Sequence, residues 1–344
     1  MRAAKRATSP TPPFSGFAVR LQISSFWSFV LAMTLVSIPA NPVPDGVVSS
    51  VFKTKDRVSI RFARWPAPPG RKGTVCVFPG RSEFIEKYFE VARDLRARGF
   101  AVATLDWRGQ GGSERALGDS RKGHVTSFAR YGIDLDAFMQ EVVLPDCPPP
   151  YYALASSMGA TILIRAAARG RRWFDRMVLC APMIKLANIP MLAVMPAVAR
   201  TLRLFGLGSN YVPGGTSTDM ATLPFLGNRV TSDPVRHART AAVLEAAPEL
   251  GLGAPTIAWV DAAFRMMAEI GVPTFPMKLR QPMLMIACAQ DQLVSNLAIE
   301  EFGSRLRVGS HLILPGAKHE ILMEQDVFRS QFWAAFDAYV PGSA

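Results

Sequence analysis

In a short stretch near the middle of the chain, residues 149–165, a predicted strand is followed almost directly by a predicted helix. The apolar run Tyr151-Tyr-Ala-Leu154 predicts a short buried strand, and the residues after Gly159 have the apolar, alanine-rich pattern of a helix. Only Ala155-Ser-Ser-Met-Gly159 lies between them, which is too short for a loop. The backbone must therefore turn sharply at the end of a sheet strand.

This tight turn identifies a candidate nucleophile. In a nucleophile elbow, a serine lies at the tip of a strand-to-helix turn, and the residues two before and two after it must be small. Ser157 has Ala155 and Gly159 at these positions, whereas Ser156 would have two bulky residues there. The turn therefore predicts Ser157 as the nucleophile.

Strand and helix patterns alternate along most of the remaining chain. An antiparallel pair at 48–53 and 57–65, with the alternation of half-exposed strands, opens the domain, and a helical pattern spans 128–143. Continuous apolar runs predict buried strands at 74–78 and 100–105, and further strands are predicted at 176–180, 282–287 and 311–314. This order predicts an α/β fold with a mostly parallel central sheet and helices on both faces.

The alternation is interrupted once, which divides the chain. We expect residues 45–182 and 281–344 to form the two parts of the core, and the apolar, methionine-rich residues 183–280 to form an inserted helical cap. Residues 1–44 form an N-terminal extension in which a basic segment precedes the uncharged stretch 21–40. That stretch resembles a signal peptide or signal anchor, but an extension that does not belong to the fold, with Met33 as the real start, is slightly favoured.

Composition limits the classes of partner. The net charge is +12, but the basic residues are scattered, so we expect no nucleic-acid groove, while a weak attraction to anionic membrane surfaces stays open. The four cysteines, three of them in apolar runs, lack the spacing of metal ligands, which predicts reduced thiols in a cytoplasmic protein without a metal site or an organic cofactor. No protein partner is predicted.

A serine nucleophile needs a base and an acid, which follow it along the chain in this topology. His319 comes directly after the strand at 311–314 and suits a catalytic loop, whereas His311 opens that strand and His237 falls in the cap, where we expect it to be solvated. Asp291 follows the strand at 282–287 and is the predicted acid. His319 would accept the serine proton, and Asp291 would hold the histidine tautomer.

The oxyanion of such a reaction needs two backbone N–H donors. The N–H of Met158 is one candidate, because it lies at the positive end of the helix after the turn. The loop after the strand at 74–78 should provide the other, and Arg81 is predicted there because Gly80 lets the backbone come close.

From about residue 45 to 340 the chain resembles the lysophospholipase and monoacylglycerol-lipase branch of the α/β-hydrolases. The resemblance is carried by Phe78-Pro-Gly-Arg-Ser-Glu-Phe, Asp106-Trp-Arg-Gly-Gln-Gly-Gly-Ser, Gly123-His-Val-Thr-Ser-Phe, Ser157-Met-Gly and the loops of Asp291 and His319. It implies hydrolysis of a carboxylic ester with a long acyl chain, so the expected partner is a lipid-like ester. The chain departs from the family pattern at Pro79, Ala155 and Ala160.

Two other functions remain open at this stage. A serine peptidase or an acyltransferase would use the same nucleophile, base and acid, although the apolar cap disfavours a peptide substrate. A non-catalytic lipid-binding protein would be expected to lack one or more catalytic residues. Ser157, Asp291 and His319 are all present, which makes this the least favoured of the hypotheses.

Overall fold

The computed structural model describes residues 35–70, 72–187 and 193–342. Its centre is an eight-stranded sheet with the order β1-β2-β4-β3-β5-β6-β7-β8. The strands are β1 Val48–Lys53, β2 Ser59–Trp65, β3 Thr74–Phe78, β4 Ala101–Leu105, β5 Tyr151–Ser156, β6 Arg176–Cys180, β7 Met283–Cys288 and β8 Gly309–Leu314. β2 pairs antiparallel with both β1 and β4, and every later pair is parallel, which confirms the predicted mostly parallel sheet.

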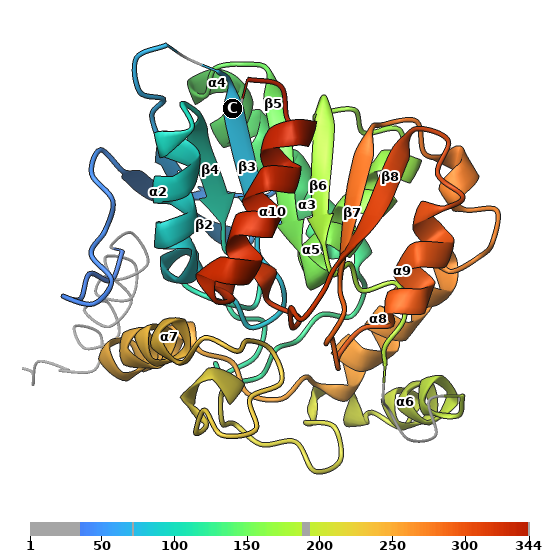
Figure 1. Cartoon of the computed structure of the whole chain (residues 1–344). Coiled ribbons are helices and arrows are strands. Elements are labelled where there is room, and N and C mark those ends of the chain that lie inside the picture. The colour runs from blue at the N-terminus through green and yellow to red at the C-terminus, as the bar shows by residue number, and fades with distance from the viewer. Residues whose placement is uncertain (1–34, 71, 188–192, 343–344) are drawn as a thin grey trace, which may run out of the picture.

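Helices cover both faces of the sheet, as predicted. Figure 1 shows α2 and α10 in front of the strands and α3 and α5 behind them. The core helices are α2 Phe89–Ala97, α3 Ala129–Phe138, α4 Leu144–Asp146, α5 Ser157–Ala168, α9 Asn296–Gly303 and α10 Asp326–Tyr339. Buried aliphatic and aromatic side chains from the strands and from these helices form one continuous hydrophobic core.

The predicted helix at 128–143 is confirmed, with α-helical geometry to Phe138 and a π-helical turn over Met139–Val143. Pro145 explains the change, because it lacks an N–H and its ring displaces the carbonyl one turn before it. β2 is almost fully buried rather than half-exposed, because it lies between β1 and β4 and its Arg61 is enclosed with two carboxylates.

The described residues between β6 and β7, 181–187 and 193–282, contain three α-helices, α6 Met195–Leu204, α7 Pro234–Ala246 and α8 Ile257–Ile270. They lie along one edge of the sheet in Figure 1, and this confirms the helical cap. β6 leads directly into the cap, so the cap covers the edge at which the parallel strands have their carboxyl ends. Local signals start two of its helices: Asp233 accepts N–H groups of α7, and Thr256 accepts the N–H of Trp259 in α8.

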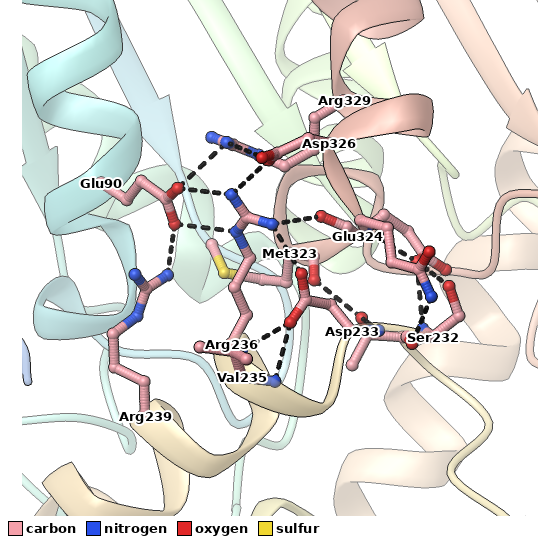
Figure 2. A network of polar contacts seen from close by, with 12 residues as sticks. Glu90, Ser232, Asp233, Val235, Arg236, Arg239, Met323, Glu324, Asp326 and Arg329 are labelled. Carbon is pink, nitrogen blue, oxygen red and sulfur yellow. Dashed lines mark hydrogen bonds and ion pairs between the residues drawn. The ribbon is translucent and has the colours of Figure 1, made fainter.

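A network of ion pairs joins the cap helix α7 to the core helices α2 and α10 (Figure 2). The guanidinium of Arg236 contacts Glu90 at 2.6 Å, Asp233 at 2.7 Å and Asp326 at 2.6 Å. Glu90 also accepts hydrogen bonds from Arg239 and Arg329, the latter at 3.1 Å. One carboxylate of α2 therefore bonds three arginines, and it fixes where α7 lies against the core.

No helix in the described ranges is long and apolar enough to cross a membrane. Of the apolar stretch at 21–40, only residues 35–40 belong to the described residues. The expected start at Met33 lies outside them.

The network in Figure 2 generates a stability prediction. Arg236→Met should lower the free energy of unfolding by about 3 kcal/mol, because it leaves partly buried carboxylates without their main partner. Arg169→Met is the matched control: Arg169 is 60% exposed beside Glu269, and its loss should cost less than about 1 kcal/mol. Urea unfolding of both variants measures the difference, and equal effects would show that the network does not hold the cap.

Candidate active site

The turn between β5 and α5 is strained at a single serine. Ser157 has a φ of 49°, in the left-handed region that residues with a side chain rarely adopt, whereas Ser156 is extended with φ −109° and ψ 136°. Strain of this kind persists only where the surrounding structure imposes it, and it is common at active sites. The backbone thus distinguishes Ser157 from its neighbour in the way that the small-residue rule does.

Close packing explains why the turn needs small residues. A Cβ atom added to Gly159 would lie 2.5 Å from the carbonyl oxygen of Pro79 and 2.6 Å from that of Phe78, which no side chain tolerates. A Cβ atom on Gly80 would lie 3.3 Å from the Cβ of Ser157, so the loop after β3 comes directly against the serine. The carbonyl of Ser157 accepts a hydrogen bond from the N–H of Met183 at 3.3 Å, which holds the turn from the other side.

Asp291 and His319 are bonded to each other after β7 and β8. Nδ1 of His319 lies 2.6 Å from Oδ2 of Asp291, and both residues are buried. The other oxygen of Asp291 accepts the N–H groups of Leu293 at 2.7 Å and Val294 at 3.0 Å. The carboxylate is therefore held in place by backbone donors and is free to fix the histidine ring in one tautomer and one orientation.

The surroundings of His319 favour its protonated form. Burial disfavours the imidazolium, but the hydrogen bond and the charge of Asp291, together with the charges of Glu320 and Glu83, outweigh burial and raise the pKa of His319 above 6.5. A histidine with a raised pKa accepts a proton more readily, which suits a base that must take the proton of a serine hydroxyl.

Two backbone N–H groups near Ser157 can receive an oxyanion. Met158 is the second residue of α5, where the N–H groups have no intrahelical acceptor and the helix dipole is positive. Arg81 follows Gly80, and within the described part of the chain no acceptor is found for its N–H. These are the two donors that the sequence predicts.

The side chain of Arg81 reaches away from this loop to the cap. Its guanidinium donates to the carbonyl of Gly253 at 2.7 Å and to the hydroxyl of Ser82 at 2.9 Å, and it lies 5.3 Å from the centre of the Trp259 ring. Burial lowers the pKa of Arg81 to about 10, against the opposing charges of Tyr131 and Asp219. The loop that carries the candidate oxyanion donor is thus tied to the cap.

The cap also holds the histidine loop, through Glu324 and Ser232 (Figure 2). Glu324 is fully buried; one oxygen accepts the N–H of Lys318 at 2.9 Å, and the other accepts the N–H and hydroxyl of Ser232 at 3.0 and 2.5 Å. The N–H of Glu320 donates to the carbonyl of Val230 at 2.8 Å. The residues on both sides of His319 are therefore bonded to the cap segment 230–232.

Four other aspartates that follow Ser157, and His237, have partners elsewhere. Asp233 and Asp219 accept backbone N–H groups, Asp261 pairs with Arg203 and Arg265, and Asp326 pairs with Arg236. The expectation that His237 is solvated was wrong: it is buried, and its ring nitrogens lie 2.9 Å from Asn228 and 3.0 Å from the carbonyl of Leu223. Its polar sequence neighbours face the ion-pair network rather than water.

The cysteines bring no reactive thiol to this site, although Sγ of Cys288 lies 4.0 Å from the carbonyl oxygen of His319. All four are free and buried, and burial raises the pKa of each thiol. In the described ranges, no group of three or more histidine, cysteine or acidic side chains is placed to hold a metal ion.

Comparison with known proteins agrees with this geometry. A model of the family described as "Serine aminopeptidase, S33" matches residues 69–326. Lysophospholipase L2 of Escherichia coli (strain K12) is 32% identical over 294 residues, which are 81% of this chain and 83% of that protein. The chain belongs to this α/β-hydrolase family, in its lysophospholipase-like branch. The probable lysophospholipase L2 of Haemophilus influenzae is 27% identical over 278 residues, which cover 80% and 86% of the two chains.

Solved structures show the same fold. A soluble variant of the monoglyceride lipase of Saccharomyces cerevisiae superimposes with a TM-score of 0.67 at 17% identity, covering 89% of this chain and 99% of that one. The monoacylglycerol lipase of Paleococcus ferrophilus gives a TM-score of 0.65 at 18% identity, covering 82% and 99%. The resemblance found in the sequence is therefore confirmed, and the chain is a carboxylic ester hydrolase.

The raised pKa of His319 generates a prediction about pH. The base must be neutral to accept a proton, so kcat/KM should fall as the pH drops through a midpoint above 6.5. Asp291→Asn removes the charge that raises this pKa, so the midpoint should move to lower pH while kcat falls by about 10⁴-fold. Asp261→Asn, a cap variant, should leave the midpoint in place. A midpoint that stays unchanged in Asp291→Asn would contradict the pairing.

Proposed function

We propose that this protein is a serine hydrolase that cleaves the carboxylic ester of a long-chain acyl lipid, a lysophospholipid or a monoacylglycerol, through an acyl-enzyme on Ser157. The observation that carries the proposal is the strained Ser157 at the sheet edge where the bonded pair Asp291–His319 also lies. A positive φ at a strand-to-helix serine has no structural benefit of its own, and it exposes the hydroxyl at the tip of the turn.

Each residue has one role in the reaction. The hydroxyl oxygen of Ser157 attacks the ester carbonyl while His319 accepts its proton, and Asp291 stabilises the imidazolium that forms. The N–H groups of Met158 and Arg81 donate to the oxygen that becomes negative. His319 then protonates the departing alcohol, and a water molecule, activated by the same histidine, releases the fatty acid from Ser157.

An apolar cavity supports a substrate with a long acyl chain. The cavity has a volume of about 650 Å³ and lies between the cap helices and α9. Its lining includes Ile184, Leu186, Phe264, Met267 and Phe302. Ile184 follows Met183, whose N–H bonds the carbonyl of Ser157, but Ser157, Asp291 and His319 themselves are not among the lining residues, which also include Lys185, Glu301 and Arg305. Its volume is in the range of small-molecule sites, and its lining suits a hydrocarbon chain.

The surface of the cap supports contact with lipid aggregates. Leu204 and Phe205 follow one another at the end of α6, each 79% exposed, and Leu226 is 96% exposed. We include this membrane-surface association in the proposal, together with a cytoplasmic location, which the free and buried cysteines support.

The family whose model matches the chain is described as "Serine aminopeptidase, S33", so the test must separate ester from peptide substrates. Purified protein is assayed in parallel with lysophosphatidylcholine, a monoacylglycerol and an aminoacyl amide. We expect release of fatty acid from at least one lipid, and a loss of at least 10³-fold in Ser157→Ala. Ser330→Ala, an exposed serine on α10, is the control and should keep full activity.

Two results would contradict this proposal. Turnover of the amide in the absence of lipid hydrolysis would identify a peptidase. Lipid hydrolysis that persists in Ser157→Ala would show that the reaction uses another nucleophile.

A further inference from the structure

The loop between β3 and the following helical turn is held by side chains on several sides. We call residues 79–83 the oxyanion loop. The indole N–H of Trp107 donates to the carbonyl of Pro79 at 2.8 Å, and the side-chain amide of Gln110 donates to the carbonyl of Gly80 at 2.8 Å. The loop also contains Ser82 with a φ of 62°, a left-handed conformation that is unfavourable for serine and must be imposed by its surroundings.

Glu83 closes this loop from within. Its side chain is almost fully buried, with a residue exposure of 5%, and Oε2 accepts the N–H of Gly80 and the hydroxyl of Tyr88, the latter at 2.6 Å. Because the carboxylate takes the N–H of Gly80, the N–H of Arg81 is the next donor in the loop that remains for an oxyanion. The hydroxyl of Tyr88 also bonds the side chain of Ser156, the residue before the nucleophile.

The same carboxylate is connected to the histidine loop. Its Oε1 lies 3.3 Å from Nζ of Lys87, and that ammonium lies 2.7 Å from Glu320, the residue after His319. The two charged pairs form a chain, Glu83–Lys87–Glu320, which is buried beside the site. The chain carries a net negative charge, since two carboxylates share one ammonium.

We propose that Glu83 is a positioning residue for the reaction: it sets the geometry of the oxyanion loop and, through Lys87 and Glu320, the position of the loop that carries His319. This inference rests on the proposed acyl transfer at Ser157. Glu83 contacts no reacting atom, and it acts through Gly80, Tyr88 and Lys87. A buried ionic network adds little net stability, because desolvation offsets the attraction, but it fixes the relative placement of the segments it joins.

Two substitutions separate the geometric effect from the electrostatic one. Glu83→Ala removes the acceptor of the Gly80 N–H, so the loop is free to leave its strained conformation. We expect kcat to fall by about 10²-fold to 10³-fold, the loss typical of a missing oxyanion donor, with KM nearly unchanged. Glu83→Gln keeps an oxygen for Gly80 and Tyr88 but not the charge, so kcat should recover to within about tenfold of the parent enzyme.

The pH profile of Glu83→Gln gives an independent readout. The charged groups that face His319 are Asp291, Glu320 and Glu83, with Lys87 between the two glutamates. Removal of one negative charge lowers the pKa of His319. The acidic limb of the pH profile, which is the fall of kcat/KM at low pH, should therefore move to lower pH. A role in folding alone would not move this limb.

Glu86→Gln is the matched control, since Glu86 is a buried carboxylate three residues further on. It pairs with Arg61 on the side of β2 and has no bond to the oxyanion loop. We expect it to lower the melting temperature at least as much as Glu83→Gln while kcat and the acidic limb stay unchanged. Stability and catalysis are thereby measured separately for the same chemical change.

The outcomes are distinct. Parent-like kcat in folded Glu83→Ala overturns the inference, and so does a Glu83→Gln enzyme whose acidic limb stays in place. If Glu83→Ala does not fold, the pH profile of Glu83→Gln alone decides. Failure of the proposed function would instead appear as lipid hydrolysis that persists in Ser157→Ala. That result does not depend on any of the Glu83 variants.

Discussion

The left-handed turn at Ser157 is the constraint on which the rest of the site depends. It occurs where β5 passes into α5 without a loop, so the serine lies at the sheet edge and the amino end of α5 lies directly beneath it. The turn requires that the loop after β3 come within contact distance, since Gly159 packs on the carbonyl groups of Phe78 and Pro79. The strain at one residue thus brings together the nucleophile and both candidate oxyanion donors, Met158 and Arg81.

The supporting shell around this turn is polar and buried. Glu83 lies behind the oxyanion loop, Glu324 behind the histidine loop, and Glu90 between the cap and the core. Each of these carboxylates accepts several hydrogen bonds; Glu90 and Glu324 join segments that are distant in sequence, and Glu83 reaches Glu320 through its near neighbour Lys87. A carboxylate with several donors is held in one orientation, and it transmits that orientation to every segment it touches. The cap is therefore part of the scaffold of His319, because Val230 accepts the N–H of Glu320 and Glu324 links Ser232 to the N–H of Lys318.

Most of the fold and the candidate residues could be predicted from the sequence because their signals are local. Apolar runs mark the buried strands, and the order of the strands places their ends at one edge, which is why Asp291 and His319 could be selected together and lie bonded at 2.6 Å. Small residues around Ser157 report the turn itself. Ala155, which departs from the family pattern, is fully buried and still permits it.

The supporting residues could not be predicted, because no local pattern indicates their long-range contacts. Nothing near Glu90 indicates that it meets Arg236 across 146 positions, and nothing near Glu83 indicates that its neighbour Lys87 also bonds Glu320 across 233 positions. The burial of β2 likewise depends on its neighbours in the sheet.

The most direct test of this account is to find which serine reacts. The protein is treated with a fluorophosphonate, digested, and the modified residue is located by tandem mass spectrometry within the peptide that contains both Ser156 and Ser157. The strained turn predicts that the adduct is on Ser157 alone. An adduct on Ser156, whose backbone is extended, would contradict the central claim.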